Sequence, residues 1–441
     1  MKRVLPSRPD PGQLKNQAKD LLKAHKRRDK GVCETLRLLT RFATLSDGEI
    51  LSQDVALHEA QYALALSYGF PSWNALKKHV EAARKEKPPA LPKRENGRVW
   101  IQGIPKLAWG RSGECTFAGA LAAALCVTSH PYSYTRIMGY TGLAFRVRWY
   151  HRLDATEWCP SSPVGEFPDE IKAVEQATGW RFHQEVMLGS PPELWKMERF
   201  SPEIMKSIDA GLPVIGYPED FNMGIVSGYE RAENQTLFLW NAYHKPEEYT
   251  MPDTRTGPFI IILREHQESP DARDAFLQAI SSNNWRRKSM PAFNPEKKGL
   301  YLLGEDALSQ WAEDIGNWDK WSEEERGNLF FVSWWCFTSL LDARRQAAPF
   351  LNEHADLFEE NIGARIRKAA AVFGEEARLL DDVFTSKEAF LGPWSGKGIS
   401  EWTPEVRARE QETLARIRQK DAAALLELDK AIALIKSSKE E

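Results

Sequence analysis

Residues 109–121 read WGRSGECTFAGAL, a polar turn that leads directly into an apolar run of small residues. The run from Cys115 to Val127 predicts a buried helix, because nearly all of its side chains are small or apolar. Cys115 stands at or near the start of that helix, where unpaired N–H groups and the helix dipole favour a thiolate. Many cysteine nucleophiles occupy such a position. Cysteine is also an ordinary small core residue, so both interpretations stay open.

The rest of the chain is organised around this segment. Residues 1–86 carry helical patterns and predict a helical N-terminal domain, and the charged, proline-containing residues 87–96 predict a linker. Residues 97–265 combine helices with later strand-like runs, which predicts an α+β domain. Residues 270–441 return to long helical patterns and predict a C-terminal helical bundle.

Composition excludes several classes of protein. The 441 residues have a formal net charge of −3, which argues against a general nucleic-acid binder. The N-terminus lacks the apolar stretch of a signal peptide, and no apolar run approaches the roughly 20 residues that span a bilayer. We therefore expect a cytoplasmic protein with no membrane partner, no metal and no cofactor. The five cysteines are scattered and form no C-x-x-C pair, which argues against a zinc knuckle or a disulfide framework: Cys33, Cys115, Cys126, Cys159 and Cys336.

Several motifs resemble a known family. The runs ECTFAGAL (114–121) and IMGYTGLAFR (137–146), together with Tyr134, resemble the butirosin-biosynthesis acyltransferase N-terminal-domain family. Those domains are similar in fold to the papain-like, C39-type cysteine peptidases, and the runs GLPVI (211–215) and GIVSGYE (224–230) fit the same scheme. The resemblance implies a papain-like fold for residues 97–265. The N-terminal runs LKNQAK (14–19) and YGFPSW (68–73) separately resemble the helical leader before ankyrin repeats in some bacterial proteins.

The chain departs from the peptidase pattern at three positions. Asn222 stands where a C39-type enzyme has its histidine, and Asn241 stands where the aspartate that orients this histidine usually lies. Trp109 replaces the glutamine that helps to stabilise the oxyanion. An asparagine amide cannot take a proton near neutral pH, so Asn222 is no general base. These departures predict that the protein is not an active protease.

Another histidine could take the place of the missing base. His244 follows Asn241 by three residues and is the provisional general base for Cys115. His130 and His183 are further candidates. Each of the three also fits the description of a surface or structural histidine.

Other residues are candidates for substrate contacts. Trp109 lies in the turn before Cys115, and Glu114 and Thr116 flank the cysteine. Trp158 lies in a proline-fixed aromatic loop of the kind that lines clefts. Arg146 could hold a carboxylate or phosphate, or form an internal ion pair. Further along the chain, Asp342 could face the cleft if the C-terminal bundle docks on the α+β domain. Five tryptophans between residues 311 and 335 predict either a sugar platform or, preferably, a seam between helices.

Two functions fit these residues. The first is a thiol-dependent acyltransferase or amidohydrolase acting on a small, amine-bearing metabolite, with Cys115 as nucleophile and its backbone N–H as oxyanion donor. In this function His244 is the provisional base, Asn222 is a polar orienting group, and Asn241 belongs to the same catalytic set. The second is a catalytically inactive protein that binds a peptide or metabolite in the same cleft. The basic surface of residues 15–28 could add a protein partner, or be a solvated helix face. A buried thiol favours binding, and an exposed thiol of low pKa favours the enzyme.

Overall fold

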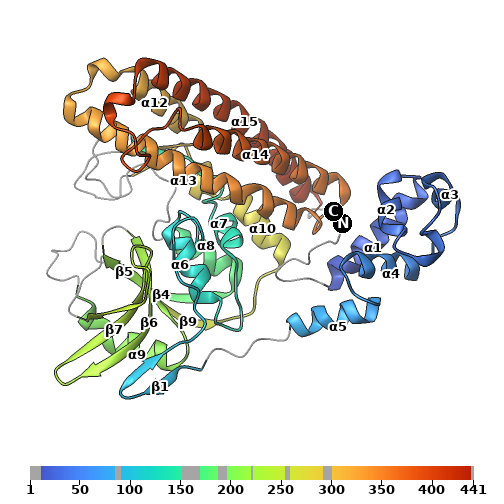
Figure 1. The fold of residues 1–441 in the computed structure, drawn as a ribbon, viewed down its shortest axis with the longest axis horizontal. Coiled ribbons are helices and arrows are strands. Elements are labelled where there is room, and N and C mark those ends of the chain that lie inside the picture. Colours follow the sequence, from blue (N-terminus) through green and yellow to red (C-terminus); the bar gives the residue numbers. More distant parts are fainter. Residues whose placement is uncertain are drawn as a thin grey trace. The chain divides into compact units, whose positions relative to one another are not determined.

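The computed structural model describes residues 11–84, 91–150, 169–186, 196–219, 222–253, 259–291 and 300–438. The chain divides into two compact units, Met1–Lys87 and Pro88–Glu441. The second unit combines β-sheet with many helices, so the α+β class with a helical C-terminal region is confirmed (Figure 1). None of the helices in the described ranges has both the length and the apolar character needed to cross a membrane.

The N-terminal unit is helical, as predicted. Its core is built from apolar residues of several short helices, including Leu36, Phe42 and Ile50. The hydroxyl of Ser72 accepts a hydrogen bond (3.0 Å) from the N–H of Ala75, so Ser72 caps the last helix of this unit. The α-helices are α1 (Pro11–Lys26), α2 (Cys33–Leu36), α3 (Asp47–Ser52), α4 (Leu57–Ser67) and α5 (Trp73–Arg84).

The second unit contains an eight-stranded antiparallel sheet. Strand β6 is its longest strand: one edge pairs with β7, and the other edge pairs first with β5 and then with β2. The strand order across the sheet is β1-β2-β6-β5-β9-β4, and β8 pairs with the outer edge of β7. The strands are β1 (Lys93–Glu95), β2 (Arg98–Trp100), β4 (Trp180–Val186), β5 (Val214–Glu219), β6 (Asn222–Ala232), β7 (Gln235–Asn241), β8 (Tyr249–Pro252) and β9 (Phe259–His266).

The two faces of the sheet have different covers. Because successive strand residues point to opposite faces, Ile215 and Val214 enter different cores. The core of Ile215 includes α6 (Thr116–Leu125), α7 (Tyr134–Tyr140), α8 (Asp169–Thr178) and α10 (Ala272–Ser281). The core of Val214 includes α9 (Ser201–Asp209). Figure 1 shows α6, α7 and α8 between the sheet and the C-terminal helices.

The C-terminal helices form the predicted bundle. It consists of α12 (Gly304–Gly316), α13 (Glu323–Ala355), α14 (Glu360–Ser386) and α15 (Pro404–Ser437). Fully buried Arg344 of α13 bonds to Glu376 (2.7 Å) and Asp421 (2.8 Å), and also to the carbonyl of Ala144 (3.0 Å). This last bond links the bundle to the chain between α7 and β3 (Arg148–Tyr150). Trp311 stacks on Trp149 of β3 (4.9 Å) and donates to the hydroxyl of Ser333 on α13 (2.9 Å), so it packs against a strand as well as a helix.

Two predicted boundaries differ from the structure. The segment 87–96 is not wholly a linker, because β1 pairs with β2 and so belongs to the large sheet. Residues 97–265 and 270–441 lie in one compact unit. A second sheet joins them, since β3 (Arg148–Tyr150) pairs with β11 (Leu300–Leu303), which also pairs with β10 (Ser289–Pro291). The short helix α11 (Asn283–Arg286) precedes β10. Three-residue strands leave too short a pattern to be read from the sequence.

Candidate functional site

Helix α6 places Cys115 at its N-terminus. Cys115 is the N-cap residue, with extended backbone angles (φ −80°, ψ 98°), and the helix begins at Thr116. Small residues let the helix pack closely, since a Cβ at Gly119 would lie 1.9 Å from the Tyr243 hydroxyl. The hydroxyl of Thr116 accepts a hydrogen bond (3.1 Å) from the N–H of Met223 on β6. The predicted buried helix is confirmed, and β6 lies beside its first turn.

Cys115 is buried at the junction between this helix and the bundle. It is only 2% exposed. Its backbone N–H donates to the hydroxyl of Tyr134 (3.1 Å), and that hydroxyl donates to the Asp342 carboxylate on α13. The tyrosine ring approaches closely because residue 113 is glycine, where a Cβ would lie 2.1 Å from the ring. The backbone N–H that was expected to face an oxyanion is therefore bonded to Tyr134.

Burial raises the pKa values of the acidic groups around Cys115. Burial raises the pKa of the Asp342 carboxyl, while hydrogen bonds from Tyr134 and from the backbone of Glu114 and Cys115 act in the opposite direction. Burial and then the charge of Asp342 raise the pKa of Glu114. The same two causes raise the pKa of Tyr134. Burial, followed by Cys115, raises the pKa of Tyr243. These groups make the junction unfavourable for a further negative charge.

Asn222 lies near the start of α6. It is the first residue of β6 and pairs with Glu219 of β5. Its neighbour Met223 donates the hydrogen bond to Thr116, so the main chain of residues 222–223 runs beside the residue that follows Cys115. The structure therefore brings the backbone of this predicted site residue close to the cysteine helix.

Asn241 ends β7 and has a different set of partners. Its side chain is 1% exposed, and its amide nitrogen donates to the carbonyl of Pro105 (2.9 Å). Its amide oxygen accepts from the N–H of Leu107 (3.0 Å) and from the ammonium of Lys106 (3.1 Å). Through these bonds Asn241 anchors residues 105–107, which lie between β2 and the turn before Cys115.

The predicted histidines have partners on several elements. Tyr243, the residue before His244, donates a hydrogen bond to the carbonyl of Ser112 (3.1 Å) and so contacts the Cys115 turn. The assignment of His244 as the base stays a prediction. The observed histidine contacts are His244 Nε2 with the Tyr249 hydroxyl (3.4 Å), His130 stacked on His266 (3.4 Å), and His183 with Glu185 (3.0 Å).

The other predicted contact residues are dispersed. Trp109 is 47% exposed and its ring packs 4.7 Å from that of Tyr243. Arg146 is 1% exposed and forms an internal ion pair with Glu170 (2.6 Å), which was the open alternative to a ligand contact. Trp158 lies outside the described residues.

Sequence reasoning gave no site role to Tyr134 or Tyr243. Tyr134 was part of the family resemblance, but nothing in one sequence indicated that its hydroxyl would bridge two elements. Asp342 was expected near the cleft only if the bundle docked on the α+β region, and the structure fulfils that condition. Tyr134 and Asp342 are 208 residues apart in the sequence, so no local pattern could predict their contact.

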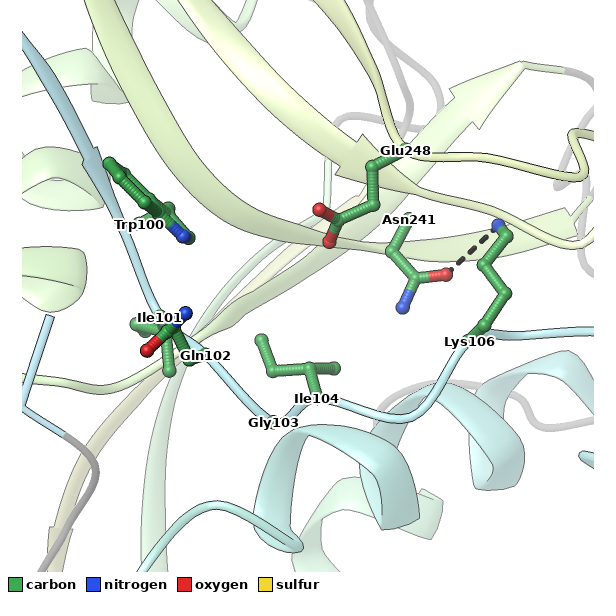
Figure 2. A pocket seen from close by; sticks show the side chains of 8 residues that line it. All are labelled: Trp100, Ile101, Gln102, Gly103, Ile104, Lys106, Asn241 and Glu248. Carbon is green, nitrogen blue, oxygen red and sulfur yellow. Dashed lines mark hydrogen bonds between the residues drawn. The ribbon is translucent and has the colours of Figure 1, made fainter. Parts of the chain in front are cut away.

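A second polar site lies on the other side of Asn241. A cavity of about 270 Å³ is lined by Trp100, Lys106 and Glu248, among others (Figure 2). Across the described ranges, no group of three or more His, Cys, Asp and Glu side chains is arranged to hold a metal ion.

Comparison with known proteins adds no relative: no family model matches the chain, and no curated protein matches its sequence. The resemblance to the butirosin-biosynthesis family therefore stays a prediction.

Proposed function

We propose that this protein is a catalytically inactive binding protein built on a papain-like scaffold. It binds a small metabolite or a peptide, and Cys115 serves as a structural residue at the junction between α6 and α13. The observation that carries this proposal is the hydrogen-bond chain from the Cys115 backbone through Tyr134 to Asp342.

The chain of hydrogen bonds argues against acyl transfer at Cys115. A thiol nucleophile needs room for the acyl group and a donor for the oxyanion. The residue is 2% exposed, and its own N–H is bonded to Tyr134. A base is also lacking at the expected position, because residue 222 is asparagine.

The arrangement of α6, β6 and β7 supports the scaffold. A cysteine at the N-terminus of a buried helix lies against an antiparallel sheet, and the two asparagines begin β6 and end the neighbouring strand β7. The papain-like scheme requires a histidine and its orienting partner on two such strands. The residues at these positions are amides, which fits a scaffold that has lost its catalytic groups.

The test compares the two thiols that flank α6. Cys115 is the N-cap and Cys126 is the C-cap of this helix, and Cys126 is the more exposed. Native full-length protein is treated with iodoacetamide from pH 6 to 9, and the labelled sites are quantified by mass spectrometry. We expect Cys126 to react and Cys115 to react at least ~100-fold more slowly, because labelling requires local opening.

The enzyme alternative predicts the reverse order. If Cys115 reacts faster than Cys126, with a rate that titrates well below the roughly 8.5 of a free thiol, the thiol is activated and the proposal is wrong. Cys115→Ser identifies the labelled peptide, and the denatured protein shows that both sites react when exposed.

A further inference from the structure

The cavity beside Asn241 has opposite charges on its wall. It lies between β2 with the segment that follows it and the residues between β7 and β8. Its volume of about 270 Å³ is below the range of drug-sized ligand sites, which begins near roughly 300 Å³. The cavity therefore suits a ligand of the size of a single amino acid or a comparable metabolite.

The Lys106 ammonium is fixed in position on this wall. It donates to the amide oxygen of Asn241 (3.1 Å) and to the carbonyl of Ala242 (2.6 Å). An ammonium has three donors, so one remains for a ligand. Burial lowers the pKa of Lys106, and the charge of Glu248 acts in the opposite direction. The two acceptors are neutral, so an anionic ligand group would stabilise the ammonium charge.

Glu248 supplies the opposite charge. Figure 2 shows its carboxylate directed into the space between Trp100 and Asn241, while the Lys106 ammonium lies on the far side of Asn241. Trp100 and Ile104 add apolar surface to the same cavity. The wall thus offers one cationic group, one anionic group and an apolar patch.

We propose that this cavity binds a free amino acid with an apolar side chain. Its carboxylate accepts from Lys106, its ammonium pairs with Glu248, and its side chain packs on Ile104 and Trp100. An anion alone would face the Glu248 carboxylate, and a cation alone would face the Lys106 ammonium. A zwitterion matches both charges, which is the reason for choosing this class. The inference names the ligand of the proposed binding function and rests on it.

The first test uses ligands and the unmodified full-length chain. L-Leucine is titrated by isothermal calorimetry beside isoamylamine, which lacks the carboxylate, and isocaproate, which lacks the ammonium. We expect leucine to bind and each analogue to bind at least ~10-fold more weakly, since each loses one charged contact. Absence of leucine binding at millimolar concentration, or equal binding of either analogue, overturns the proposal.

The second test uses a matched pair of glutamates. Glu248→Gln removes the carboxylate that faces the cavity, and Glu247→Gln removes an exposed carboxylate one residue earlier. We expect a loss of leucine affinity of ~10-fold for Glu248→Gln and none for Glu247→Gln. Equal affinities in the two variants contradict the site. Cys115→Ser should bind leucine with the affinity of the unmodified protein. A failure to bind leucine would therefore contradict only the ligand proposal, and a fast reaction of Cys115 with iodoacetamide would contradict only the inactive role of the thiol.

Discussion

The Cys115 junction and the Lys106 cavity lie at two ends of one short segment, and they differ in how their polar groups are satisfied. At the junction, the Cys115 N–H, the Tyr134 hydroxyl and the Asp342 carboxylate bond to one another. At the cavity, Lys106 keeps a donor beyond its two protein acceptors, and Glu248 is exposed. The backbone of Cys115 thus bonds to protein groups, while Lys106 and Glu248, which the sequence did not single out, line a cavity.

The largest effect on stability is expected when the hydrogen bonds at the Cys115 junction are removed. Asp342→Ala removes the acceptor for Tyr134 and for the backbone of residues 114–115, and should destabilise the Pro88–Glu441 unit by about 3 kcal/mol. Urea unfolding followed by tryptophan fluorescence measures this, because fifteen of the sixteen tryptophans lie in that unit. Cys115 should also become more reactive to iodoacetamide.

Asp381→Ala is the control for this variant. Asp381 pairs with Arg345 at a half-exposed position near the same helix, and its loss should cost no more than about 0.5 kcal/mol. If both variants have the same free energy of unfolding, Asp342 does not stabilise the junction.

An intermediate effect on stability is expected at Asn241, which lies between the two sites. Asn241→Ala leaves the N–H of Leu107 and the carbonyl of Pro105 without their buried partner, which should cost about 2 kcal/mol. It should also weaken leucine binding, because Lys106 loses one of its two anchors. The matched variant Asn222→Ala, at a half-exposed position, should change stability by less than about 0.5 kcal/mol. Equal losses of stability in the two variants would show that the hydrogen bonds of Asn241 contribute no more than the side chain of Asn222.

The smallest effect concerns pH. Because the pKa of Asp342 is raised from its ordinary 3.8, the folded state binds more protons than the unfolded state in the window above that value. The contribution of Asp342 to stability therefore falls as pH rises from 3.8 through the folded pKa. Asp342→Asn removes this dependence, so the stability of the unmodified protein should decline relative to the variant as the pH rises above 3.8. A constant difference in unfolding free energy across this range would contradict the raised pKa.

Much of the helical structure could be predicted from local patterns. The long amphipathic stretches produced α13 to α15, and the small-residue run produced α6 after Cys115. The strand β4 was missed because its residues, WRFHQEV, include four polar side chains. The strand β1 was assigned to a linker because its residues are all charged, although pairing with β2 makes it part of the sheet. Pairing with a neighbour, rather than residue type, decides such edge strands.

The sequence by itself determined the class of the fold, the position of Cys115 at the start of a buried helix, and the absence of a histidine at position 222. Only the tertiary structure decided what surrounds that thiol. The side chains of Tyr134, Asp342 and Tyr243 reach it from three different segments, and Lys106 and Glu248 come together in the lining of one cavity. The physical reason is that periodicity reports local burial, whereas hydrogen-bond satisfaction depends on residues brought together by packing over long sequence distances.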